Sequence, residues 1–166
     1  DRLYDDFFYR RNNEFWKDKA MMKLPALLDS TGMLACGEDL GMIPATVPQV
    51  MSDLRILSLE IQRMPKSIHD NFANPAWYPY LSVCTTSTHD MNPIRAWWEE
   101  DREVTNDFWH MILGNQGEAP YFCEPWICRQ ILEQHVWSPA MLSILPLQGW
   151  LSMDPQLRRE NPNEER

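Results

Sequence analysis

Residues 33–42 constrain the fold most, because a short apolar run there leads directly into two adjacent carboxylates between glycines. Residues 33–36 are apolar, and Gly37, Glu38, Asp39 and, two positions later, Gly41 follow. A run that is apolar on both faces is typical of a parallel strand covered by helices. The loops after such strands carry the functional groups in barrels and in doubly wound sheets. The pattern predicts a strand over 33–39 that ends at a functional site, with Glu38 as its first candidate.

The remaining sequence alternates helical and strand patterns. Strands are predicted over 55–61, 81–85 and 141–147, and helices over 2–22, 44–54, 93–100, 104–113 and 124–136, with a shorter helix that starts at Pro25 and ends at Gly32. A proline-rich loop fills 65–80, and loops of that length are usually functional. This order points to parallel strands joined by right-handed crossovers.

Four strands cannot close a (β/α)8 barrel, which needs eight strands and about 250 residues. We therefore expect an α/β fold that is the C-terminal half of such a barrel, so that residues 1–166 form a partial catalytic domain. Residues 154–166 are polar, and we expect a loose tail there. The chain does not begin with Met and opens within a helical pattern, so we expect it to be a piece of a longer protein.

The amino-acid composition argues for some classes of binding partner and against others. A net charge of −9 argues against nucleic acid and against an anionic membrane, since both need a basic face. Eight Trp residues and 44% hydrophobic residues fit a neutral polyhydroxylated ligand better, because sugar rings lie on aromatic faces. The four cysteines form no C-x-x-C pair, which favours free thiols in a reducing compartment and thus a cytoplasmic protein. No apolar stretch approaches the length of a membrane span.

Functional side chains follow three of the predicted strands: Glu38 with Asp39, His89 with Asp90, and Gln148. A single acidic residue at a strand end is often only a helix N-cap, and Asp39 or Asp90 fits that role. Acidic groups at the ends of two parallel strands face the same rim of a barrel, however. Carboxylates gathered on one rim suit glycosyl transfer, in which one protonates the leaving oxygen and another stabilises an oxocarbenium-like centre.

Two aromatic pairs and one His-Asp pair bear on this interpretation. Trp77 and Tyr78 lie in the long loop and favour stacking on sugar rings, whereas core packing is at least as well supported for the pair at 97–98. A His-Asp pair also occurs in metal-dependent phosphohydrolases. The other three histidines show no metal-ligand spacing around His89, so we expect no metal site.

Several motifs in this order resemble one known family. Cys36–Gly41 (CGEDLG), Thr85–Asp90 (TTSTHD) and Pro146–Gln148 (PLQ) are similar to the 4-α-glucanotransferases of glycoside hydrolase family 77. The stretches FCEP at 122–125 and NPNEER at 161–166 resemble most closely the larger bacterial and plant-cytosolic type. The likeness covers nearly the whole chain.

The resemblance implies a (β/α)8 barrel that transfers α-1,4-glucan segments by a retaining double displacement, without a metal or organic cofactor. It implies that Glu38 is the general acid/base, Asp90 the transition-state stabiliser and His89 a sugar-binding residue. Asp39 is expected to support the site, and Gln148 to lie at its rim.

Two positions depart from the family pattern. The family's nucleophilic Asp lies in an Arg-x-Asp-His type motif that is absent here, so we expect it upstream of Asp1 and expect the 166-residue chain alone to be inactive. Gly149 stands where relatives usually carry Asp. A non-catalytic α/β module that binds glucan or protein is the alternative. A half-barrel also exposes a strand edge, and we expect the chain to self-associate.

Overall fold

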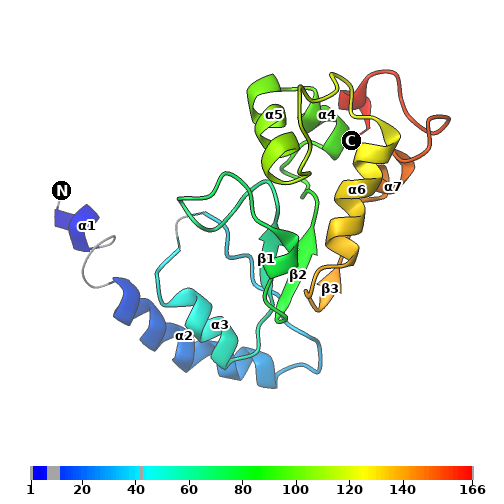
Figure 1. Cartoon of the computed structure of the whole chain (residues 1–166). Coiled ribbons are helices and arrows are strands. Elements are labelled where there is room, and N and C mark those ends of the chain that lie inside the picture. The colour runs from blue at the N-terminus through cyan, green and yellow to red at the C-terminus, as the bar shows by residue number, and fades with distance from the viewer. Residues whose placement is uncertain (1, 7–11, 42, 166) are drawn as a thin grey trace. The chain divides into compact units, whose positions relative to one another are not determined.

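The computed structural model describes residues 2–6, 12–41 and 43–165. These residues form an α/β fold with a three-stranded parallel sheet in the order β1-β2-β3 (Figure 1). The helices and strands, in chain order, are α1 (Arg2–Asp5), α2 (Asn12–Asp29), α3 (Val47–Asp53), β1 (Ser58–Ile61), the 3-10 helix η2 (Pro75–Trp77), β2 (Ser82–Thr85), α4 (Ile94–Trp98), α5 (Arg102–Met111), α6 (Pro125–Val136), β3 (Leu142–Ser143), α7 (Leu147–Leu151) and the 3-10 helix η3 (Pro162–Glu164).

The chain divides into two compact units. Unit 1 comprises Asp1–Leu59 and Leu81–Val83, and unit 2 comprises Glu60–Tyr80 and Cys84–Arg166. In unit 1, α2 and α3 lie side by side (Figure 1). The core of this unit is a small cluster of Val47, Met51 and Ile56, against which Leu24 and Leu28 of α2 pack.

Unit 2 has the larger hydrophobic core, built on α4, α5 and α6. Trp98 and Phe108 are completely buried, with ring centroids 6.3 Å apart in an edge-to-face arrangement. Two of the helix starts follow from the local sequence. Asp101 caps α5 by accepting from the backbone N–H groups of Glu103 and Val104, and Pro125 occupies the first turn of α6, where it costs no hydrogen bond.

The predicted N-terminal helices differ from the observed ones. A helix was expected over 2–22, but α1 ends at Asp5, residues 7–11 lie outside the described part of the chain, and α2 starts at Asn12. The prediction of a new helix at Pro25 is wrong, because α2 continues through it to Asp29. Proline removes one helical hydrogen bond, and packing of the neighbouring Leu24 and Leu28 on the unit 1 core offsets this loss.

Two predicted strands are much shorter than expected. Residues 33–39 form a single parallel bridge between Cys36 and Leu57, and Met33 is 78% exposed, so this run is not covered on both faces. The strand expected over 141–147 contains only Leu142 and Ser143. Pro146 cannot donate to a sheet, and it instead precedes α7, which contains Gln148.

The segment 154–165, expected to be loose, makes several specific contacts in unit 2. The Glu165 carboxylate forms an ion pair with Arg95 of α4, and both side chains are 8% exposed. Glu165 also accepts from the backbone N–H of Arg159 at 3.1 Å, and the Arg95 guanidinium donates to the Arg159 carbonyl at 3.0 Å. These contacts hold the described end of the chain against α4.

Candidate active site

The segment that carries Glu38 is fixed in unit 1 by its backbone and by its neighbour. The Gly37 N–H donates to the Leu57 carbonyl at 2.8 Å, and the buried Asp39 carboxylate accepts from the Leu59 N–H at 2.9 Å. Glu38, between these two anchors, is exposed. Asp39 therefore supports the segment against β1, while Glu38 is free of packing and is presented to solvent.

Gly37 packs closely against the unit 1 core at this point. A Cβ atom placed there would lie 2.9 Å from the terminal methyl of Met51 and 3.4 Å from Ile56. The absence of a side chain lets the backbone approach the unit 1 core, which brings the following carboxylates to the end of the bridged segment.

His89 and Asp90 lie in unit 2, in the loop between β2 and α4. The His89 Nε2 and Asp90 Oδ2 atoms are 3.2 Å apart, and the two side chains are 90% and 79% exposed. Within the loop, the Thr88 hydroxyl accepts from the Asp90 N–H at 3.3 Å. Packing therefore restrains the two side chains little, and the pair is open to a ligand.

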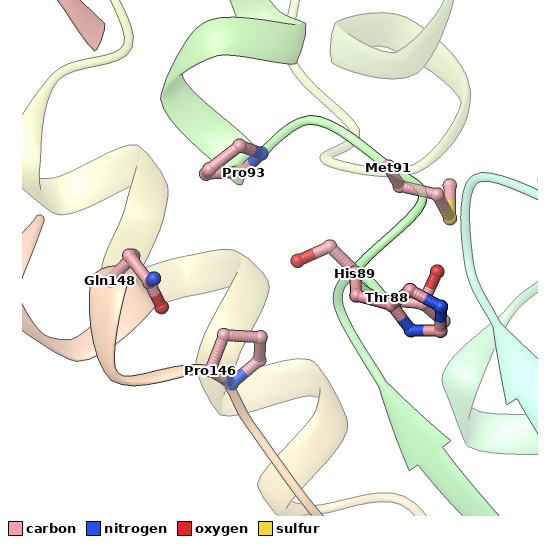
Figure 2. A pocket seen from close by; sticks show the side chains of 7 residues that line it. Thr88, His89, Met91, Pro93, Pro146 and Gln148 are labelled. Carbon is pink, nitrogen blue, oxygen red and sulfur yellow. The ribbon is translucent and has the colours of Figure 1, made fainter. Parts of the chain in front are cut away.

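A pocket of about 380 Å³ in unit 2 joins this loop to the start of α7 (Figure 2). His89 and Gln148 both line it, although Gln148 comes from a helix rather than from the strand end that was expected. The full lining is Ser87, Thr88, His89, Met91, Pro93, Pro146 and Gln148. Sequence reasoning did not select the other five as site residues, although Ser87, Thr88 and Pro146 lie within the motifs that carry the family resemblance.

Trp77 and Tyr78, predicted together as sugar-stacking residues, have opposite environments. Trp77 is 83% exposed at the end of η2. Tyr78 is 5% exposed and packs edge-to-face on His135, with ring centroids 6.4 Å apart. Burial raises the pKa of the Tyr78 hydroxyl, which has no hydrogen-bond partner among the described residues. The Trp77 ring is therefore open to a ligand, whereas the Tyr78 ring is already covered.

The titratable groups of the described residues form no metal centre. Within residues 2–6, 12–41 and 43–165, no three His, Cys, Asp or Glu side chains are grouped so that they could hold a metal ion. Over the same residues, each helix is too short or too polar to cross a bilayer. Cys84, Cys123 and Cys128 are buried thiols, and Cys36 is exposed.

Comparisons with known proteins agree in pointing to one family. A sequence model described as 4-alpha-glucanotransferase matches residues 1–165. The chain is 42% identical over 164 residues to the 4-alpha-glucanotransferase DPE2 of Oryza sativa subsp. japonica, and 29% identical over 147 residues to a 4-alpha-glucanotransferase of Chlamydia trachomatis. These alignments cover 99% and 86% of this chain, but it spans only 17% and 27% of the relatives' own lengths.

One solved structure supports the fold. The amylomaltase from Streptococcus agalactiae, in complex with acarbose, superposes with a TM-score of 0.59 at 15% identity, covering 85% of this chain and 32% of that one. At that identity the superposition shows a shared fold alone. The sequence model, which covers almost the entire chain, shows more: the chain belongs to the 4-α-glucanotransferases of glycoside hydrolase family 77.

Proposed function

We propose that the protein containing this chain transfers α-1,4-glucan segments between maltooligosaccharides by a retaining double displacement. We also propose that the chain is the C-terminal half of its (β/α)8 barrel. Membership of the family supports the reaction. The sheet supports the architecture, because the segment at Cys36 pairs with Leu57, directly before β1, and the strands then follow in chain order, as they do around a barrel.

Glu38 is proposed as the general acid/base, on the basis of its exposed carboxylate and its place after the bridged segment. In the first step its proton passes to the glycosidic oxygen as the C1–O bond breaks and an aspartate attacks C1. In the second step the Glu38 carboxylate accepts the proton of an acceptor hydroxyl, which attacks C1 and releases the aspartate. That aspartate is proposed to precede Asp1, about 5–5.5 Å from Glu38, because retaining enzymes use this separation.

Asp90 and His89 are proposed to contact the sugar unit whose C1 atom reacts during transfer. Positive charge develops at C1 in the oxocarbenium-like transition state, and a fixed carboxylate close to it lowers the barrier. His89 is proposed to hydrogen-bond a sugar hydroxyl, with Gln148 across the pocket as a second polar contact and Trp77 as a stacking platform. The observation that carries this proposal is the pocket that His89 and Gln148 share.

The proposal is tested by kinetics of maltotriose disproportionation with the full-length protein. Glu38→Gln keeps the shape of the side chain but removes the transferable proton, so kcat should fall by at least ~100-fold. Asp90→Asn should lower kcat while leaving KM within about threefold, because a group that acts only on the transition state changes kcat. Glu118→Gln, a change of the same kind at an exposed glutamate, is the matched control and should retain full activity.

A Glu38→Gln protein that keeps most of its activity would remove this residue from the mechanism. Acarbose gives an independent check, because the Streptococcus agalactiae amylomaltase is known in complex with it. We expect acarbose to compete with maltotriose in the full-length protein. An enzyme that acarbose leaves unaffected would contradict a glucan site built like the proposed one.

A further inference from the structure

The loop that carries His89 and Asp90 is held at both ends by a single side chain, that of Arg63. The Arg63 Nε and Nη2 atoms donate to the Thr86 carbonyl at 3.2 and 2.8 Å, where β2 has just ended. Nη2 also donates to the Asn92 carbonyl at 2.8 Å, just before α4 begins. One planar guanidinium thus spans the two ends of the loop.

The guanidinium is itself fixed by an aromatic ring. Its central carbon lies 4.8 Å from the ring centroid of Trp97, which is on α4. Trp97 in turn packs edge-to-face on the buried Phe108, with centroids 5.2 Å apart. A cation over an aromatic face is attracted to it, and here the face belongs to the unit 2 core. The position of Arg63 is therefore set by the core and not by solvent.

The surroundings of the Arg63 guanidinium keep it positively charged. Burial lowers the pKa of Arg63 to about 10, and the nearby Glu100 carboxylate opposes this shift, so the side chain stays protonated at neutral pH. Glu100 also accepts a hydrogen bond from the Asn92 amide at 3.0 Å. Arg63 and Glu100 thus bind the same residue of the loop through its backbone and its side chain.

The exposed tip of the loop depends on these anchors. The side chains of His89 and Asp90 are 90% and 79% exposed, so packing restrains them little. The hydrogen bonds that the N–H groups of Asp90 and Met91 donate to Thr88 lie within the loop itself. The direction of the tip is therefore determined where the loop is joined to the rest of unit 2, at Thr86 and Asn92.

We propose that Arg63 is a positioning residue for glucanotransfer, and that its bonds to Thr86 and Asn92 set the position of Asp90 and His89 at the sugar. The inference rests on the proposed function. Lysine cannot replace arginine here, because an ammonium lacks the planar fork that reaches two carbonyls while lying on a ring. A misplacement of about 1 Å at a reacting centre costs on the order of 100-fold in rate.

The test is Arg63→Lys in the full-length protein, measured beside Arg102→Lys. Arg102 is a matched control: it also donates to two carbonyls, those of Ala119 and Pro120, and also lies on an aromatic ring, that of Tyr121 at 5.6 Å. Among the described residues, Arg102 donates no hydrogen bond to the loop of residues 86–92. We expect Arg63→Lys to lower kcat by about 10- to 100-fold with KM changed less than about threefold. Arg102→Lys should leave both constants unchanged.

Two further measurements separate positioning from a general loss of structure. In Arg63→Gly, added guanidinium ion should restore part of kcat, whereas the same ion should not improve Arg102→Gly. Amide hydrogen exchange in Arg63→Lys should rise in residues 86–92 and stay unchanged in α6. The positioning role of Arg63 is contradicted if Arg63→Lys keeps the wild-type kcat or if guanidinium ion does not raise the kcat of Arg63→Gly. It is also contradicted if amide hydrogen exchange rises throughout unit 2.

The outcomes distinguish this inference from the proposed function. An active wild-type protein with an equally active Arg63→Lys variant would overturn the role of Arg63 and leave the glucanotransferase proposal standing. A wild-type protein without disproportionation activity would overturn the proposed function and, with it, the catalytic part of this inference. Hydrogen exchange in residues 86–92 would then decide alone whether Arg63 anchors the loop.

Discussion

Two adjacent carboxylates, Glu38 and Asp39, have different environments that fit different roles. Asp39 is 3% exposed and accepts a backbone hydrogen bond from Leu59, whereas Glu38 is exposed. The sequence indicated a functional pair at this point but left the role of Asp39 open between an N-cap and a support. In the structure the Asp39 carboxylate accepts from the Leu59 N–H of β1, which ties the segment to that strand, and its part in the site stays a prediction.

Asp39→Ala should lower the free energy of unfolding by about 1–3 kcal/mol, because the Leu59 N–H then loses its acceptor in a partly buried setting. Asp39→Asn is the control, since its amide oxygen can still accept this bond and should retain most of the stability. Urea denaturation of both variants measures the difference. Equal losses in the two variants would show that the charge, and not the hydrogen bond, is what matters.

His135 provides a pH-dependent contribution to stability. The residue is completely buried, its Nδ1 atom lies 2.8 Å from the Ile131 carbonyl, and burial lowers its pKa. Below about pH 6.5, the ordinary pKa of histidine, the unfolded chain takes up a proton that the folded chain resists. The free energy of unfolding should therefore fall as pH drops below about 6.5, by at most about 1.4 kcal/mol per pH unit from this group.

Replacement of His135 by Gln, which keeps a polar group of similar size without a titrating ring, should flatten this dependence between pH 7 and pH 5. Urea denaturation across that range measures it. A His135→Gln protein with the same pH slope as wild type would assign the slope to other groups.

At the scale of elements, sequence patterns located most helices and strands but misjudged their lengths. The periodic helices around 104–113 and 124–136 are observed as α5 and α6, shifted by one or two residues. The apolar runs at 33–39 and 141–147 were predicted as full strands. An apolar run, however, does not by itself show that the segment hydrogen-bonds to a neighbouring strand along its whole length. Pairing depends on a neighbour's length and register, which no local pattern contains, so both runs pair over two or three residues only.

Burial of individual loop residues was also beyond the sequence. Trp77 and Tyr78 are consecutive, yet one is exposed and the other faces His135. Arg63 was missed as well, since an arginine after a strand gives no local sign that it will meet two carbonyls from a loop more than twenty residues away. Both errors concern contacts between segments distant in sequence, which only the folded chain brings together.

Gly149 lies in α7 at the position where relatives usually carry Asp. Substitutions there show whether an aspartate would lower the stability of the fold. The residue is buried, and a Cβ there would lie 3.4 Å from Leu132 and 3.8 Å from Ile94, which are ordinary contact distances. Gly149→Ala should raise the free energy of unfolding by about 0.5–1 kcal/mol, because alanine favours helix over glycine. Gly149→Asp should lower it by about 1–3 kcal/mol, because it buries a carboxylate against apolar side chains.

Thermal denaturation of the two variants compares these effects. If Gly149→Asp is as stable as wild type and also raises the activity of the full-length protein, α7 tolerates the group that relatives usually carry, and the local packing described here does not exclude it.

At the scale of the whole molecule, the chain leaves much apolar surface uncovered. Among the exposed side chains are Phe15, Met22 and Leu27 of α2, each more than 60% exposed. The sheet also ends at β3, whose two residues are exposed. Because exposed edges and apolar faces promote association, we expect the isolated 166-residue chain to form dimers or larger assemblies. Light scattering at increasing concentration measures this, and a constant monomer mass would contradict it.

The most direct measurement of the central claim is disproportionation of maltotriose by the full-length protein, with the 166-residue chain assayed in parallel. The account predicts glucose and longer maltooligosaccharides from the full-length protein and no products from the chain alone, because the chain lacks the proposed nucleophilic aspartate. Turnover by the isolated chain would contradict the proposed position of the nucleophile. A full-length protein that releases no products from maltotriose would contradict the glucanotransferase function itself.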